Sequence, residues 1–284
     1  MLIARIAKGS SSAIAAGPAP DQLTDLTAGG AVNSVADAVA AALAGELDGL
    51  VAAGEPVRDP VTLLAPVDGN ARILCAGFNF TTGATPPTGD RVDAHPTLFV
   101  RFPSSLVGPG EPIVRPRASE RLDWEGEVAA VIGRAGRRIT EDAALDHVAG
   151  YVCFGDHSVR DFQRHGTQAT AGKNFDGSGA IGPWIVTADA LAPVSDLEVR
   201  TRLNGEQVQH GQLSRLVFSV PALIAYVSTF MALRPGDVIA TGTPPGIGAK
   251  RQPPRWMSPG DRLEVDVVGV GVLANDVIDD DEDR

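Results

Sequence analysis

The chain has 284 residues, of which 44% are hydrophobic and 21% are charged, and its formal net charge is −11. This composition is that of a globular protein with a substantial core, and the absence of a basic run argues against a nucleic-acid partner. Two cysteines give no disulfide framework, and no apolar run reaches the length of a membrane span or a secretion signal, so we expect a cytoplasmic protein without a membrane partner.

Residues 1–67 are predicted to form a small N-terminal α/β domain. A strand is expected at Met1–Ala7, and Ser34–Leu50 has the spacing of apolar residues that is typical of one amphipathic helix. Ser34 is the expected N-cap of this helix, and Gly54 marks its end. Prolines that punctuate the passage into the next domain stand at positions 56, 60 and 66.

Residues 68–278 are predicted to form a larger, mostly β domain, so that the whole chain belongs to the α+β class. Short apolar segments bounded by turn residues recur along this domain, and helices are few. The expected strands are Arg72–Phe78, Leu98–Phe102, Leu122–Gly133, Tyr151–Phe154, Gly182–Thr187, Leu197–Leu203, Gln207–His210, Val238–Thr241 and Arg262–Val268. The expected helices are Thr140–His147 and Val217–Leu233. Asn204-Gly205 is a strong hairpin signal, and residues 279–284 are an acidic tail that we expect to be disordered and solubilising.

The strand Leu122–Gly133 begins with polar residues and ends in an apolar run. Side chains two residues apart in a strand point to the same face, so Glu125 and Glu127 direct their carboxylates to one place. Like charges this close repel each other, and a hard divalent cation such as Mg²⁺ or Ca²⁺ relieves the repulsion because it binds carboxylate oxygens. A solvated strand end is the alternative interpretation.

Asp156 follows an apolar strand and begins a predicted short helix. On such a helix, Arg160 and Gln163 share a face with Asp156. If Asp156 joins Glu125 and Glu127, three carboxylates offer an oxygen cage for Mg²⁺ or Mn²⁺ with positions left open for water and substrate. The alternative is a helix cap with a surface ion pair between Asp156 and Arg160.

Two further segments carry residues that suit a binding site. Lys173 lies in a loop without the P-loop pattern, and close to a metal and a carbonyl its ammonium would stabilise developing negative charge. Gly242–Gly248 follows a strand, so its glycines let backbone amides approach a ligand while Thr243 adds a hydroxyl. A solvated lysine and a tight turn are the alternatives. The spacing of Cys153, His157 and His165 matches no recognised zinc pattern.

Four motifs taken together resemble those of the fumarylacetoacetate hydrolase family. They are Asp123-Trp124-Glu125-Gly126-Glu127, Gly155-Asp156-His157-Ser158-Val159-Arg160-Asp161, Gly172-Lys173-Asn174-Phe175-Asp176 and Gly242-Thr243-Pro244-Pro245-Gly246-Ile247-Gly248. The resemblance runs from about Arg72 to Val277, and the leading unit resembles the small N-terminal domain of many members. It implies a mixed, mostly β roll as the catalytic core, commonly paired into homodimers.

The resemblance also implies roles for individual residues. Glu125, Glu127 and Asp156 match the family's ligands of Mg²⁺, Mn²⁺ or Ca²⁺. The positions that match contacts to the substrate's keto-acid or diketone oxygens are Lys173, Thr243, Arg160 and Gln163, and we add Gly242 because its amide can approach a ligand. Members typically hydrolyse a C–C bond in acylpyruvates or similar β-diketo acids, whereas others decarboxylate oxaloacetate or tautomerise related enols. We therefore expect a metal-dependent C–C hydrolase of a small diketo acid, with a decarboxylase or keto–enol isomerase as the alternative.

The sequence departs from the family pattern in one place. Hydrolytic members commonly carry Asn-Tyr-x-x-His-x-x-Glu, whose His and Glu position and deprotonate the attacking water. Gly83 and Pro86 stand at these two positions here. Thr81–Pro96 is predicted to be a mobile cover over the metal, and His95 is our candidate for the missing base. The other candidates are Asp90, Asp93 and His157. If nothing replaces the pair, the chemistry needs no activated water.

Overall fold

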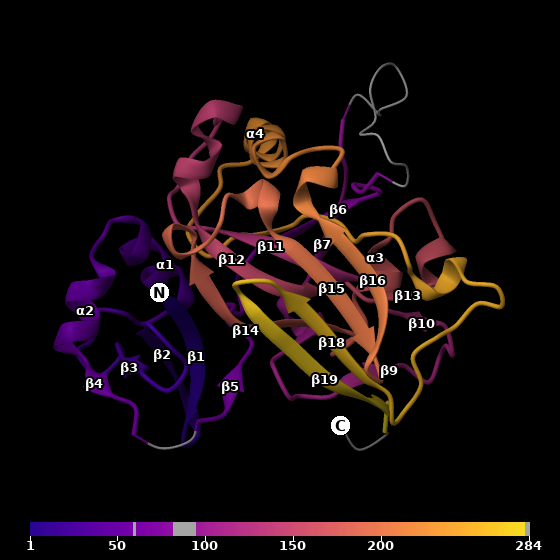
Figure 1. Ribbon diagram of the computed structural model, residues 1–284, viewed down its shortest axis with the longest axis horizontal. Coiled ribbons are helices and arrows are strands. Elements are labelled where there is room, and N and C mark those ends of the chain that lie inside the picture. Colours follow the sequence, from indigo (N-terminus) through magenta and orange to yellow (C-terminus); the bar gives the residue numbers. More distant parts are fainter. Residues whose placement is uncertain (59–60, 82–94, 282–284) are drawn as a thin grey trace.

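The computed structural model describes residues 1–58, 61–81 and 95–281. Three β-sheets dominate this part of the chain, and the helices are few and short (Figure 1). The large sheet contains twelve described strands, ten of which follow the order β4-β3-β2-β1-β14-β12-β11-β17-β6-β7. Its pairs are mixed, because β17 runs parallel to β6 whereas β11 runs antiparallel to β12. The predicted mostly β, α+β class is confirmed.

The bounds of the elements are as follows. The strands of the large sheet are β1 (Leu2–Lys8), β2 (Ser11–Gly17), β3 (Thr24–Asp25), β4 (Glu55–Pro56), β5 (Leu63–Leu64), β6 (Ile73–Gly77), β7 (Thr97–Arg101), β8 (Leu106–Val107), β11 (Gly126–Ile132), β12 (Val148–Gly155), β14 (Gly179–Thr187) and β17 (Val238–Ala240). A two-stranded sheet contains β10 (Leu122–Asp123) and β13 (Ser158–Val159). The third sheet contains, in spatial order, β16 (Glu206–Gln212), β15 (Glu198–Leu203), β18 (Arg262–Val267), β19 (Gly271–Asp279) and β9 (Ile113–Arg115). The α-helices are α1 (Val35–Leu43), α2 (Leu47–Ala53), α3 (Thr170–Lys173) and α4 (Val220–Phe230). The 3₁₀ helices are η1 (Pro103–Ser105), η2 (Glu141–His147), η3 (Phe162–Arg164), η4 (Ala188–Ala190), η5 (Val194–Asp196), η6 (Leu213–Arg215) and η7 (Gly248–Lys250).

The N-terminal unit continues the large sheet. Its first strand pairs with β14, with Leu2 opposite Val186, and the unit lies at one end of the molecule (Figure 1). The prediction of a single helix over 34–50 was wrong. Two helices, α1 and α2, occupy this segment, because Gly45 adopts a left-handed backbone with φ +75° that ends the first of them. The Ser34 cap is confirmed, since its Oγ accepts the Asp37 N–H at 3.0 Å. The domain boundary at residue 67 stays a prediction.

Both faces of the large sheet are buried around β11. Val128 and Ala130 belong to the core under the third sheet, which packs through β15, β18 and β19 on β11, β12 and β14. Ala129 and Val131 belong to a second core, which α1 covers from the opposite face. A strand that is buried on both faces has a near-continuous apolar sequence, and this explains the run after Glu127.

The later elements agree with the sequence in kind and differ in detail. The hairpin at Asn204-Gly205 is confirmed, with both residues at positive φ between β15 and β16. The helix predicted to begin at Asp156 was wrong: β13 follows it and pairs with β10. The predicted acidic tail starts later than expected, because Asp279 belongs to β19 and pairs with Arg115.

No helix within the described ranges is long and apolar enough to cross a membrane. The cytoplasmic location stays a prediction.

Candidate active site

Three carboxylates meet where β11 begins and β12 ends. Glu125 immediately precedes β11, Glu127 lies within it, and Asp156 follows β12. The antiparallel register places Gly126 opposite Gly155, and the Asp156 N–H donates to the Glu125 carbonyl at 2.8 Å. One oxygen of each carboxylate lies within 4.8 Å of the others, and all three residues are buried. The structure therefore brings together the three predicted metal ligands.

Three cations surround these carboxylates. The Lys173 ammonium lies 2.5 Å from an Asp156 carboxylate oxygen and 3.1 Å from one of Glu125. The Arg160 guanidinium lies 2.5 Å from the other Glu125 oxygen. Arg101 Nη1 lies 3.0 Å from Asp156 Oδ1. Burying so many charges is costly unless each finds a partner, so the network is held by mutual compensation.

Glu125 is the carboxylate that the cations compensate best. Burial opposes its ionisation, but Arg160, Lys173 and a hydrogen bond from Ser158 Oγ at 2.8 Å hold the pKa of Glu125 down at about 2. The group is therefore a permanent anion at neutral pH.

The pKa of Glu127 is shifted in the opposite direction from that of Glu125. Burial and the negative charges of Asp156 and Glu125 raise the pKa of Glu127 well above its ordinary value. Its Oε2 accepts the Gly242 N–H at 2.7 Å, and within the described residues no ion pair joins it to a cation. A buried carboxylate that makes no ion pair and lies beside two other carboxylates is an arrangement that a hard divalent cation completes, so the residues present fit such an ion.

Arg160 pairs with Asp123 and Glu125, and not with Asp156 as the alternative interpretation had it. The surface Asp156–Arg160 pair was wrong, because Arg160 Nε donates to Asp123 Oδ2 at 2.8 Å while Nη2 faces Glu125. Gln163 does join Arg160, whose Nη1 donates to its Oε1 at 3.0 Å. Asp123 is held in turn by the N–H groups of Gly248 and Ala249, at 2.7 and 3.0 Å. The glycine-rich segment thus supports Arg160 through Asp123.

Lys173 ends the four-residue helix α3, and its side chain is buried. Its Nζ also donates to the Asp156 carbonyl at 2.6 Å and lies 4.9 Å from the centre of the Phe99 ring. Burial opposes the charged form, yet Asp156 and Glu125 raise the pKa of Lys173 above its ordinary value. The side chain is therefore an ammonium and not a free base.

Gly242 and Thr243 contact the strand that carries Glu127, and their role in substrate binding stays a prediction. Gly242 binds Glu127 through its amide, and Thr243 Oγ1 donates to the Gly126 carbonyl at 3.0 Å. Asn79 fixes the neighbouring strand end, because its Nδ2 donates to the Thr241 carbonyl at 2.8 Å.

Two buried residues of the site, Arg101 and Gln209, were not predicted from the sequence. Arg101 ends strand β7 directly after the apolar run Leu98–Val100, and a charged residue in that position is the signal that would have identified it. Its guanidinium also donates to the His157 carbonyl at 2.9 Å and to Ser178 Oγ at 3.1 Å. Gln209 lies on β16 with no local signal, because its partners come from segments distant in sequence.

The candidates for the base lie in different places. Gly83, Pro86, Asp90 and Asp93 lie outside the described residues, as does most of the predicted cover. His95 is exposed and stacks on Tyr226 of α4, with ring centres 5.4 Å apart. His157 is fully buried, and its Nδ1 accepts the Glu125 N–H at 3.2 Å. Burial, followed by the nearby Arg101 charge, lowers the pKa of His157 to about 3, so the ring is neutral.

Cys153 and His165, whose spacing matches no zinc pattern, make other contacts. Cys153 Sγ donates to the Gly271 carbonyl at 3.2 Å, and His165 packs on Phe162 with ring centres 4.5 Å apart.

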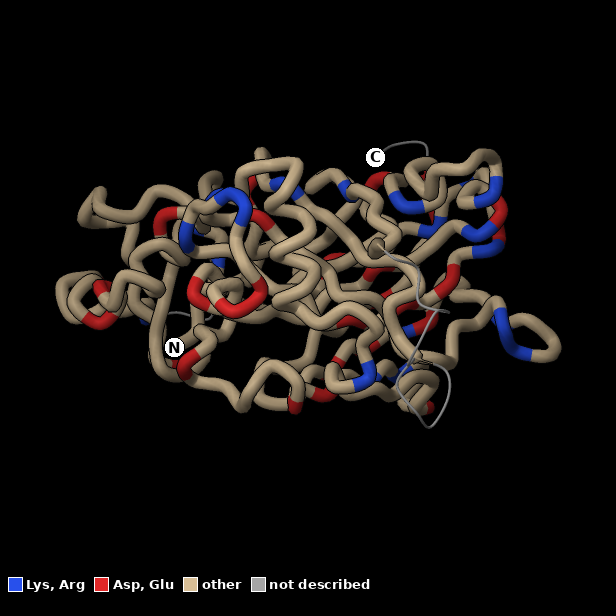
Figure 2. The backbone as a smooth tube through the Cα atoms, turned by 90° about the horizontal axis from the view of Figure 1, so that it is seen from above, with Lys and Arg blue, Asp and Glu red and all other residues tan. Residues whose placement is uncertain are grey.

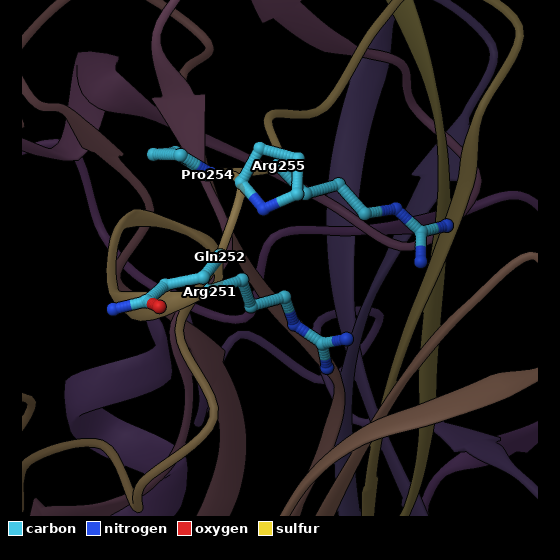
Figure 3. A pocket seen from close by; sticks show the side chains of 5 residues that line it. Arg251, Gln252, Pro254 and Arg255 are labelled. Carbon is cyan, nitrogen blue, oxygen red and sulfur yellow. The ribbon is translucent and has the colours of Figure 1, made fainter.

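A surface pocket lies beside Trp124, the residue that precedes Glu125. It is lined by Arg251, Gln252, Pro253, Pro254 and Arg255 (Figure 3). The two guanidinium groups lie 5.4 and 5.9 Å from the Trp124 ring centre and both pair with Glu206. Lys and Arg residues gather at the end of the molecule near the C-terminus (Figure 2). The pocket contains none of the three carboxylates, so we place the chemistry at the buried triad.

Comparison with known proteins shows which family the chain resembles. Residues 72–278 match the family model for the C-terminal domain of fumarylacetoacetate hydrolase. The chain is 41% identical over 223 residues to the mitochondrial oxaloacetate tautomerase FAHD2A of Homo sapiens, which covers 78% of this chain and 71% of that protein. The structure of fumarylacetoacetate hydrolase from psychrophilic Exiguobacterium antarcticum superposes with a TM-score of 0.87 at 34% identity, covering 99% of this chain and 100% of the other. Maleylpyruvate hydrolase from Sphingobium sp. SYK-6, in complex with manganese(II) ion and pyruvate, gives a TM-score of 0.81 at 27% identity over the same shares.

Proposed function

The chain belongs to the fumarylacetoacetate hydrolase family, and on this premise we propose that it is a divalent-metal-dependent tautomerase, which interconverts the keto and enol forms of a 2-oxo dicarboxylic acid such as oxaloacetate. The observation that carries the proposal is the buried triad of Glu125, Glu127 and Asp156 beside the Lys173 ammonium. Mg²⁺ is the expected ion, with Mn²⁺ or Ca²⁺ as alternatives.

The charges of the site suit an anionic substrate. Four buried carboxylates lie beside three buried cations, so the site carries one net negative charge when all of these groups are ionised. The carboxylates are Asp123, Glu125, Glu127 and Asp156, and the cations are Arg101, Arg160 and Lys173. A divalent cation reverses this balance to one positive charge. An enolate carries negative charge, so the loaded site stabilises it more than the neutral ketone.

The residues of the chain have separate tasks in this proposal. A bound divalent cation supplies Lewis-acid chemistry to the substrate oxygens. Glu125, Glu127 and Asp156 hold it, and Lys173 keeps positive charge beside the oxygen on which the enolate charge develops. Arg160, held by Asp123 and joined to Gln163, orients the substrate carboxylate.

Tautomerisation is favoured over hydrolysis because it does not require an activated water molecule. The reaction moves a proton between carbon and oxygen and consumes no water, so no base is needed to activate a water nucleophile. Gly83 and Pro86 stand where hydrolytic members carry that pair. The 41% identity to an oxaloacetate tautomerase supports the same choice.

Hydrolysis of a C–C bond in an acylpyruvate-like acid, which the sequence analysis expected, remains the second candidate. The similarity to a maleylpyruvate hydrolase over nearly the whole chain favours it. Decarboxylation of a β-keto acid at the same ion is a further outcome of the test below.

The experiment uses metal-depleted protein to which Mg²⁺ or Mn²⁺ is returned. Loss of the ultraviolet absorbance of enol-oxaloacetate is followed and compared with the loss in buffer and metal alone. Parallel assays measure solvent deuterium uptake and pyruvate release. A further assay measures oxygen-18 incorporation from labelled water into the products of an acylpyruvate. Tautomerisation accelerates enol loss without cleavage. Enol loss at the rate of buffer and metal alone would refute the proposal, and incorporation of labelled oxygen with cleavage would favour hydrolysis.

Two variants control this experiment. Glu127→Gln removes one of the proposed ligands and should abolish the metal-dependent rate. Glu46→Gln makes the same chemical change at an exposed position without a side-chain cap bond, and should leave the rate unchanged.

We also propose that the protein acts as a homodimer on its small-molecule substrate. Exposed apolar side chains near the edge strand β7 support this, since Phe78 is 91% and Phe102 is 54% exposed in the single chain. Size-exclusion chromatography with light scattering measures the mass, and a monomer at micromolar concentration would refute a stable dimer.

A further inference from the structure

Gln209 lies on β16, in a different sheet from the proposed metal ligands, yet it contacts the peptide between two of them. We propose that Gln209 is a positioning residue for the metal-binding strand, acting through Gly126 and Thr243. The inference rests on the proposed metal site and adds a residue for which neither the motifs nor the ligand chemistry provides a role.

Gly126 separates Glu125 from Glu127 and is a weak point in the geometry of the site. Glycine has more backbone freedom than any other residue, so the two carboxylates on either side of it are not held in place by local conformation. A residue with a side chain would restrict the backbone here, but none fits, because a Cβ on Gly126 would lie 2.1 Å from Thr201 Oγ1 of β15. The restraint must therefore come from partners outside the strand.

Strand β12 pairs with one side of β11, but β17, the neighbour on the other side, does not reach Gly126. Strand β17 pairs with β11 only from Ala129 to Val131, and the last backbone-to-backbone hydrogen bond on this side runs from the Thr241 N–H to the Val128 carbonyl at 3.1 Å. Backbone groups of successive strand residues point to opposite sides, and Glu125 uses the β12 side. The N–H and carbonyl of Gly126 consequently lie on the side where the ladder has ended.

Two side chains take the place of the missing strand. Gln209 Oε1 accepts the Gly126 N–H at 3.0 Å, and Thr243 Oγ1 donates to the Gly126 carbonyl at 3.0 Å. Gln209 Nε2 then donates to Thr243 Oγ1 at 2.8 Å and to the Pro244 carbonyl at 2.7 Å. The three groups form a closed ring, in which the single hydroxyl hydrogen of Thr243 is directed at Gly126.

The carboxamide has no alternative to these partners. Gln209 is 2% exposed, and its oxygen and both amide hydrogens are used. Strand β16 fits closely against the glycine-rich segment, since a Cβ on Gly246 would lie 2.2 Å from the Val208 carbonyl. Gln209 therefore fixes the Glu125-Gly126-Glu127 peptide and the segment whose Gly242 amide binds Glu127.

Removing Gln209 should loosen the proposed metal ligands without touching them. Residues that orient metal ligands typically change metal affinity by about 10–100-fold when mutated. We expect Gln209→Met, which keeps the side-chain length and loses the hydrogen bonds, to weaken Mn²⁺ binding about tenfold or more. Gln207→Met is the matched control, because Gln207 is exposed on the same strand, and its affinity should equal that of the wild type.

The measurement is isothermal titration of metal-depleted protein with Mn²⁺ in the absence of substrate. Thr243→Val and Thr243→Ser extend it, because valine breaks the ring whereas serine keeps the hydroxyl and should retain most of the affinity. Circular dichroism establishes that each variant is folded.

The outcomes separate this inference from the proposed function. A wild type that binds no Mn²⁺ overturns both. If folded Gln209→Met binds Mn²⁺ as tightly as the wild type does, the inference is overturned and the proposed function is not. If Gln209→Met does not fold, Thr243→Val decides: weaker binding than in Thr243→Ser supports the inference, and equal binding overturns it.

Discussion

Replacing Arg101 with methionine should destabilise the protein strongly. Arg101 is 1% exposed, and its removal takes away one of the two cations that pair with Asp156, at 3.0 Å, leaving only Lys173 at 2.5 Å. Breaking a buried ion pair from one side typically costs about 3–5 kcal/mol. Each kcal/mol lowers Tm by about 2–4 °C in proteins of roughly this size, so a fall of roughly 6–20 °C is expected in calorimetry with a chelator present.

The pH dependence of this loss has a definite sign. Burial already raises the pKa of Asp156 above 3.8, and loss of the guanidinium raises it further. A carboxyl whose pKa is raised by folding contributes stability at low pH that is lost as the pH rises through the folded-state pKa. The difference in Tm between variant and wild type should therefore be largest near neutral pH and should narrow toward pH ~4.

A surface pair provides the control for this experiment. Arg262→Met breaks a pair with Asp276 at 2.9 Å in which the side chains are 54% and 66% exposed. Exposed pairs contribute about 0–1 kcal/mol, so the fall in Tm should be small. If Arg101→Met lowers Tm no more than Arg262→Met, the buried pair does not stabilise the site as argued.

Four further predictions, on three variants, concern the segment that carries Glu125 and Glu127. Glu127→Gln should raise Tm in chelator, because burial and the charges of Asp156 and Glu125 raise the pKa of Glu127, so its ionised form is destabilising at neutral pH. The same variant should lose the wild type's stabilisation by Mn²⁺, about 2.7 kcal/mol at a hundredfold excess over Kd, and an unchanged metal response would contradict the ligand assignment. The pKa of Glu125 is lowered from 4.5 to about 2, so its contribution to stability is present above pH 4.5 and is lost as the pH falls toward 2. The difference in unfolding free energy between wild type and Glu125→Gln should therefore shrink on acidification. A difference that stays constant with pH would argue against this role. Gly126→Ala should cost about 1–3 kcal/mol in denaturant unfolding by crowding Thr201, and adding Thr201→Ala should recover part of the loss.

Local rules determined much of this protein from its sequence. Period-two alternation placed Glu125 and Glu127 on one side of a strand, and the structure confirms that they meet. The Asn204-Gly205 turn and the Ser34 cap were also predictable, because each depends on residues within a few positions. The four motifs pointed to the family for the same reason: they are short, contiguous and chemically distinctive.

The tertiary structure decided which distant groups became partners. Helical spacing suggested an Arg160–Asp156 pair, but the pairing of β10 with β13 brings Arg160 to Asp123 and Glu125 instead. Arg101 and Gln209 reach the site from strands far away in the chain, and no local pattern records which carboxylate or amide they meet. Those contacts are set by strand register and by the packing of one sheet on another. Such nonlocal terms are absent from propensity and periodicity, and for this reason they appear only once the chain is folded.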